Sequence, residues 1–211
     1  MTIKATSALS ILAIWAAMIP AVVVSHGAWW SLIFAFLATC SVGVSAWRKL
    51  GLSRLFAIAG TWTGTAIAIG SHEGNAWISI FAFLTTAAIV YSVMRRNDIL
   101  TGIGIAAAWL VVGVVLVVAS DTSGAWISVL AFLTAGAVAN NRGRRGRGLA
   151  AVFWWCVAGA IIVAVGGGGW YALSIAAFLL TAASLGFGDF HFPSHIEWDL
   201  LDRDDDGGYV G

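Results

Sequence analysis

Side chains that could bind a metal ion lie in the short polar segments between long apolar runs. His26 and His72 occupy matching places in two of these segments, Glu73 follows His72, and Asp121 lies in a third. Imidazole and carboxylate groups are suitable ligands for first-row transition metals. Loop histidines are more often simply solvated, however, and no sequence feature makes the segments converge. We therefore expect no metal, with these four residues as the only candidates.

The cores of the apolar runs contain no Asp, Glu, Lys, Arg or His. Ionisable groups inside a membrane mark proton relays, ion paths and counter-ions. Their absence argues against a proton-coupled carrier, a voltage sensor, a retinal protein and a haem held by two histidines within the membrane. A pore for a neutral solute is still compatible. Serine-hydrolase, zinc-protease, Cys-x-x-Cys and phosphate-loop motifs are absent too, so we expect no enzyme and no cofactor.

Residues 186–211 form an acidic segment outside the apolar runs. It includes Asp202, Asp204, Asp205 and Asp206. Such a composition is typical of a flexible, solubilising tail. The alternative is that it docks onto a partner subunit or onto the basic segment 142–147, although salt would weaken those ion pairs.

The composition places the remaining chain in a bilayer. Of its 211 residues, 60% are hydrophobic and 10% are charged, and the mean hydropathy is +0.92. This lies well outside the range of soluble proteins. Eight continuous apolar runs predict eight transmembrane helices, because lipid-facing strands would alternate with period two. The runs are residues 7–25, 28–46, 52–70, 76–93, 99–120, 125–139, 149–165 and 170–185.

The eight runs are the two halves of four tandem repeats. An Ala-Phe-Leu step starts at Ala35, Ala82, Ala131 and Ala177, at intervals of 47, 49 and 46 residues. This fixed period indicates duplication of a helical hairpin. The repeats cover approximately residues 7–50, 51–97, 98–146 and 147–185, within one transmembrane bundle at 1–185. The first run also fits a signal-peptide core, but that reading would leave the second helix without its partner.

Basic residues gather in the connections between hairpins, whereas the hairpin tips are nearly uncharged. The connections carry Arg48, Lys49 and Arg54, then Arg95 and Arg96, then Arg142, Arg144, Arg145 and Arg147, and Lys4 precedes the first hairpin. Positive residues in short loops stay on the cytoplasmic side. We therefore expect the N- and C-termini to lie on the cytoplasmic side of a prokaryotic cytoplasmic membrane, with the hairpin tips outside. Orientation and contact with anionic lipid account for these basic segments, and no nucleic-acid partner is expected.

Two sets of tryptophans recur with the repeat. Trp30, Trp77 and Trp126 begin outward-end helix turns, where an indole can anchor in the headgroup layer. The second set lies in the middle of the odd-numbered helices, at Trp15, Trp62, Trp109 and Trp155. We expect these four in the interior, bonded to a neighbouring hydroxyl or carbonyl. The alternatives are a row of aromatic faces for a lipid, quinone or carotenoid, and packing against bulk lipid.

Small residues recur on one face of the even-numbered helices. Ser79, Ala82 and Thr86 fall on one side of a helix, and Ser128, Ala131 and Ala135 repeat this pattern. Small side chains let helix backbones approach closely in lipid, so we expect this face to be a packing seam. Gly60 and Gly64 bracket Trp62 in a spacing that also favours close packing.

Two functions are compatible with these features. The first is a non-enzymatic membrane protein with a structural, accessory or assembly role, in contact with lipid and associated with other copies or a larger complex. The second is a channel or facilitator for a neutral or hydrophobic solute, with four hairpins around a pseudo-symmetric axis. A filled interior favours the first function. A cavity lined by hydroxyls favours the second; the candidates are Thr61, Thr63, Thr65, Ser79 and Ser128.

Overall fold

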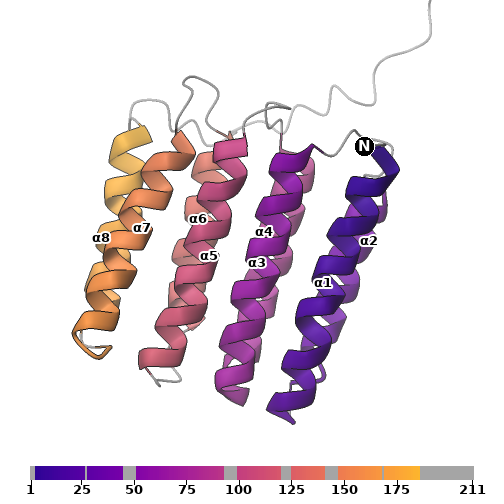
Figure 1. Cartoon of the computed structure of the whole chain (residues 1–211), viewed down its shortest axis with the longest axis horizontal. Helices are drawn as coiled ribbons and strands as arrows, with labels where there is room; N and C mark the ends of the chain where they lie inside the picture. The colour runs from indigo at the N-terminus through magenta and orange to yellow at the C-terminus, as the bar shows by residue number, and fades with distance from the viewer. Residues whose placement is uncertain are drawn as a thin grey trace, which may run out of the picture.

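The computed structural model describes residues 3–26, 28–44, 51–92, 99–119, 125–140, 147–167 and 169–185. Within these ranges the chain forms eight α-helices, one short 3-10 helix (η2, Glu73–Trp77) and no strand (Figure 1). The α-helices are α1 (Ile3–Ser25), α2 (Ser31–Val44), α3 (Leu52–Ser71), α4 (Ile78–Tyr91), α5 (Ile99–Ala119), α6 (Ala125–Asn140), α7 (Arg147–Ala164) and α8 (Trp170–Leu185). The eight predicted runs each match one helix, with ends that differ by a few residues.

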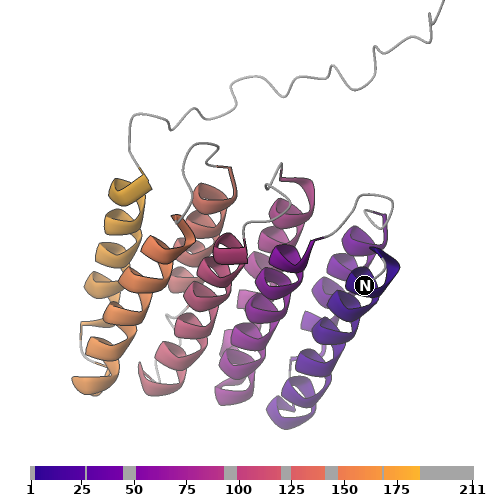
Figure 2. The same ribbon diagram turned by 45° about the horizontal axis from the view of Figure 1, so that its top comes forward.

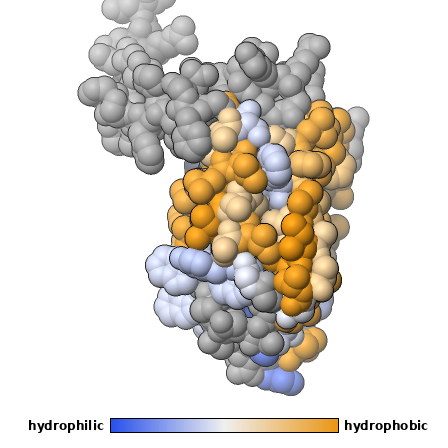
Figure 3. Space-filling model, turned by 90° about the vertical axis from the view of Figure 1, so that its left-hand side faces the viewer, coloured by the Kyte–Doolittle hydropathy of each residue, from blue (hydrophilic) through white to orange (hydrophobic). Residues whose placement is uncertain are grey.

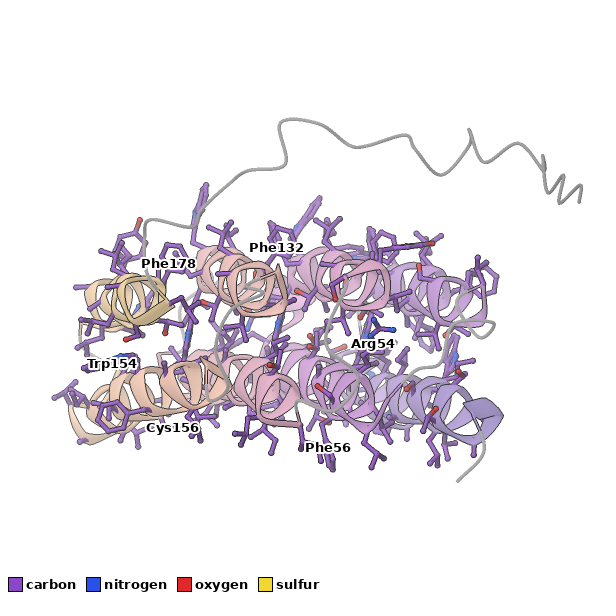
Figure 4. All side chains as sticks on the ribbon, turned by 90° about the horizontal axis from the view of Figure 1, so that it is seen from above. Arg54, Phe56, Phe132, Trp154, Cys156 and Phe178 are labelled. Carbon is purple, nitrogen blue, oxygen red and sulfur yellow. The ribbon has the colours of Figure 1, made fainter. Side chains whose placement is uncertain are left out.

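The helices form two layers. We call α1, α3, α5 and α7 the odd layer, and α2, α4, α6 and α8 the even layer; within each, neighbours in this order lie side by side. Each odd helix also packs on the even helix that follows it in the chain. Figures 1 and 2 show the odd layer as a row along the long axis, and Figure 4 shows both rows from above. The four hairpins therefore stand in a line.

Glycines bring the helices of the odd layer into backbone contact. A Cβ atom added at Gly60 would collide with Ala106, and one added at Gly64 would collide with the carbonyl of Trp109. In the opposite direction, a Cβ at Gly113 would stand 2.6 Å from the carbonyl oxygen of Gly64. These contacts join α3 to α5, the most extensive helix pair in the structure. Dispersion between closely spaced backbones therefore holds the centre of this layer.

The Ala-Phe-Leu step has a separate contact for each side chain. Its alanines are buried, at positions 35, 82, 131 and 177. Two of its phenylalanines contact the preceding even helix, since Phe83 lies 6.3 Å from Phe34 and Phe132 lies 6.5 Å from Phe81 between ring centroids. Phe36, in the first even helix, is exposed. Its leucines are exposed, at positions 37, 84, 133 and 179. In α4 and α6, the three side chains of this step thus contact the interior, the neighbouring helix and the surface in turn.

The two layers differ in helix length. Three odd helices are long and apolar enough to cross a membrane, over Ala5–Ser25, Leu52–Ser71 and Ile99–Val118. The even helices have 14 or 16 residues, which at 1.5 Å per residue is about 21–24 Å. The hydrocarbon core of a bilayer is about 30 Å thick. The even helices alone therefore fall short of that thickness.

The backbone contact at Gly64 predicts the effect of a single methyl group. Gly64→Ala should destabilise the protein by about 1–3 kcal/mol, because overpacking forces the backbones of α3 and α5 apart. Gly70→Ala in the same helix is the matched control, since nothing lies within 4 Å of its added Cβ. Alanine also has the higher helix propensity, so the control should be neutral or slightly stabilising. Thermal unfolding in detergent measures both, and equal midpoints for the two variants would contradict the contact.

Candidate functional site

The space between the two layers holds a row of indole rings. Trp62 and Trp155 are fully buried there, and Trp15 is half-buried. Each indole N–H donates to a threonine hydroxyl of the even layer: Trp15 to Thr39 at 3.0 Å, Trp62 to Thr86 at 2.9 Å, and Trp155 to Thr134 at 3.3 Å. The row therefore links the layers through both ring packing and hydrogen bonds.

The three threonines are themselves held in place. Each hydroxyl donates to the backbone carbonyl four residues earlier, at 2.9 Å for Thr39, 2.9 Å for Thr86 and 2.8 Å for Thr134. A threonine that bonds its own helix backbone in this way leaves its oxygen free to accept one further hydrogen bond. The indole N–H supplies that bond. Donor and acceptor capacity are thus matched at these three places.

Trp109 is the exception. It is fully buried, and its Nε1 has no hydrogen-bond partner in the structure. In the predicted repeat its counterpart Trp62 uses Thr86, and the position equivalent to Thr86 is occupied by Ala135. Alanine has no hydroxyl to offer. The third indole of the row therefore differs from our expectation that all four find a hydroxyl or carbonyl.

The small residues of the predicted seam are all buried. Ser79, Ala82, Ser128 and Ala131 have no exposed surface. Thr86 on this face of α4 accepts the N–H of Trp62 from α3, so the face packs against α3.

The hydroxyls proposed as pore-lining groups lie in different surroundings. The buried Thr61, Thr65 and Ser79 donate to carbonyls of Ala57, Thr61 and Ala76, at 2.8, 2.8 and 2.6 Å. Ser128 is buried as well, and Thr63 is exposed on the surface of α3. The donor hydrogens of these three hydroxyls are thus used within their own segments.

The tryptophans at the start of the even helices lie near the surface. Trp77 is 60% exposed and Trp126 is 65% exposed. Trp30 is partly buried and packs on Trp77, with ring centroids 5.0 Å apart. These rings sit at one end of the even layer, close to the turns within the hairpins. That placement is compatible with an interfacial anchor.

Arg54 joins the layers at the other end of a hairpin. Its Nη2 donates to the carbonyl of Ser92 at 2.7 Å, where α4 ends. A cation near the last carbonyls of a helix is favoured by the helix dipole. In Figure 4 the side chain lies between the rows. The sequence places Arg54 only in a basic connection. Its place in the first turn of α3 could have indicated a contact within the bundle, but a backbone carbonyl acceptor such as that of Ser92 has no sequence pattern.

The metal candidates are not brought together by the described residues. His26 and His72 are exposed, while Asp121 and the side chain of Glu73 lie outside the described part. Among the residues that are described, no group of three or more His, Cys, Asp or Glu side chains could hold a metal ion. Asp202, Asp204, Asp205 and Asp206 also lie outside it. The metal and tail hypotheses remain predictions from the sequence.

The chain was compared with protein-family models, with curated proteins and with solved structures, and none of them matches it.

The bond between Trp62 and Thr86 predicts an asymmetric mutational effect. Thr86→Val keeps the shape of the side chain but leaves a buried indole N–H unpaired, so stability should fall by about 1–3 kcal/mol. Thr63→Val is the control, because that threonine is exposed. Chemical unfolding in detergent, followed by far-UV circular dichroism, compares the two variants. A Thr86→Val protein as stable as the control would show that the bond contributes nothing.

Proposed function

We propose that the chain is a non-enzymatic, multi-pass membrane protein whose eight helices span the bilayer as four tandem hairpins and whose role is structural, accessory or in complex assembly. The observation that carries this proposal is the row of indole rings between the layers, three of which donate to threonine hydroxyls of the even layer. Trp62 and Thr86 are fully buried and satisfy one another. Among described side chains the sole Asp, Glu, Lys or Arg is Arg54, and it lies near one end of the helices.

The outward faces support a lipid environment. Large apolar side chains are exposed along both layers, including Ile33 and Phe36 on α2 and Phe56 on α3. Phe56 and Cys156 point away from the even layer in Figure 4. The end formed by α7 and α8 is predominantly apolar in Figure 3. Contiguous apolar surface on this scale is unfavourable in water and favourable in lipid.

The two ends of the row carry bulky residues where the inner repeats carry small ones. Two residues before the mid-helix tryptophan, the first three repeats have Ala13, Gly60 and Ala107, whereas the last has Phe153. Gly60 contacts the next odd helix, and Phe153 is 57% exposed. The outer side of α7 therefore carries a bulky apolar residue where α3 has a glycine contact.

The end of the row formed by α1 also carries a bulky residue where the other odd helices carry a small one. Four residues after the tryptophan the later repeats have Ala66, Gly113 and Gly159, whereas the first has Ile19, which is 52% exposed. Gly113 and Gly159 both contact the preceding odd helix. Bulky apolar side chains at both ends of this row are compatible with contact with lipid. Association with other copies or other membrane proteins would then use the broad faces of the layers.

The row arrangement favours this role over a facilitator. A solute path between hairpins requires polar groups that face an opening, but Thr61, Thr65 and Ser79 each bond a carbonyl of their own segment. The helices also stand in two lines, and the facilitator hypothesis required hairpins around an axis. Both observations favour a bundle of packing and anchoring residues without a conduit.

The proposed topology predicts opposite labelling of two positions. In a background without Cys40 and Cys156, Gly74→Cys should react with a membrane-impermeant maleimide from the outer side of the membrane, because it lies in a hairpin tip. Gly143→Cys, in a basic connection, should react only after the membrane is permeabilised. Intact cells and inverted vesicles provide the two readings. Reaction of both positions from the same side would contradict the four-hairpin topology.

The proposed role predicts no solute flux. Proteoliposomes that contain the purified protein should shrink in hyperosmotic sucrose or glycerol at the rate of protein-free vesicles, measured by stopped-flow light scattering. Vesicles with a known water channel provide the positive control. A faster rate that rises with the amount of protein would support the facilitator and overturn the scaffold.

A further inference from the structure

We propose that Trp109 and Thr85 form a buried site between α4, α5 and α6 that binds one water molecule. The first observation is that both side chains have unpaired polar atoms. The Nε1 of Trp109 and the Oγ1 of Thr85 have no hydrogen-bond partner, and both residues are fully buried. This inference depends on the register of the predicted repeat and stands independently of the proposed function.

The repeat register offers each mid-helix indole two hydroxyl positions. One lies in its own hairpin, four residues after the alanine of the Ala-Phe-Leu step, and Trp62 uses it through Thr86. The other lies in the preceding hairpin, three residues after that alanine, and Trp155 uses it through Thr134 at 3.3 Å. Every indole that the structure pairs in this row uses one of these two positions.

For Trp109 only the second position has a hydroxyl. Its own hairpin has Ala135 in place of the threonine, and the preceding hairpin has Thr85. The pair Trp109 and Thr85 is thus the register equivalent of the bonded pair Trp155 and Thr134. In the other three pairs of the row the indole N–H donates to the threonine, whereas Trp109 and Thr85 both have an unpaired polar atom. Two orphaned polar atoms at matching positions point to a common partner.

Ala135 provides the space for that partner. A threonine there would add two non-hydrogen atoms beside the row of indoles, as Thr86 does in the preceding repeat. We infer that their absence leaves room for one water molecule, whose share of liquid volume is about 30 Å³. Ala135 is 1% exposed, and Trp109 and Thr85 are fully buried. The site is therefore closed, which favours a single small molecule over a lipid or quinone.

Water also fits the chemistry of the two groups. It accepts the N–H of Trp109 and donates to the oxygen of Thr85, while the Thr85 hydroxyl is free to donate elsewhere. Each of the two groups would otherwise carry the desolvation cost of an unpaired polar atom in an apolar interior. Buried waters typically make about three such bonds and behave as part of the structure.

Nuclear magnetic resonance of the indole N–H groups tests the site. The full-length protein, labelled with 15N-tryptophan in detergent micelles, gives one signal per indole, assigned with Trp109→Phe and Trp62→Phe. We expect a cross-relaxation peak between water and the Trp109 N–H and none for Trp62. The Trp109 N–H should also exchange with deuterated solvent several-fold faster than the Trp62 N–H.

Two variants distinguish a bound water from a direct bond between Trp109 and Thr85. Ala135→Thr restores the hydroxyl of the other repeats, so the water peak of Trp109 should disappear and its exchange should slow to that of Trp62. Thr85→Val removes the second partner of the water and should weaken the peak. The matched control, Thr86→Val, should perturb Trp62 and leave Trp109 unchanged. An unchanged Trp62 signal in the first two variants reports that they remain folded.

The outcomes that overturn the proposal are specific. A wild-type Trp109 N–H that has no water peak and exchanges as slowly as that of Trp62 would indicate a dry or directly bonded indole. If slow exchange becomes fast in Thr85→Val, the two side chains bond directly without water. A water peak that survives Ala135→Thr unchanged would place the water elsewhere.

Discussion

The close approach of α3 and α5 is the constraint on which the rest of the structure depends. At Gly64 the backbone of one helix meets the backbone of the other, and no side chain fits between them. The axes of α3 and α5 within the odd layer are therefore close together, whereas indole rings lie between the odd layer and the even layer. An indole is the one large apolar side chain that also carries an N–H donor, so each ring requires an acceptor opposite. The threonines of the even layer follow from that requirement.

Much of this arrangement could be predicted from residue periodicity. The helix positions follow from continuous apolar runs, and the buried face of α4 follows from the small residues Ser79, Ala82 and Thr86. The arrangement of the hairpins in a row could not be predicted, because the residue pattern within one hairpin would be the same if the hairpins formed a ring. The information lies in comparisons between repeats, such as Phe153 against Gly60. The partner of Arg54 is a backbone carbonyl, which no sequence pattern marks.

A chain built in this way uses its polar atoms for cohesion. The hydroxyls of Thr61 and Thr65 bond helix carbonyls, the threonines opposite the indoles do so as well, and Arg54 holds the end of α4. In the proposed function, the broad apolar faces are the contact surface for lipid or for other membrane proteins. The unpaired atoms at Trp109 and Thr85 are therefore conspicuous in this interior.

The line of hairpins can be tested with the two native cysteines, Cys40 on α2 and Cys156 on α7, which are both exposed. They belong to the first and last hairpins, which three lateral steps of about 8–10 Å each would separate. Spin labels on the two cysteines, measured by double electron–electron resonance in nanodiscs, should therefore give a main distance of about 25–30 Å or more. A main distance of about 15 Å or less would place the first and last hairpins side by side and contradict the row.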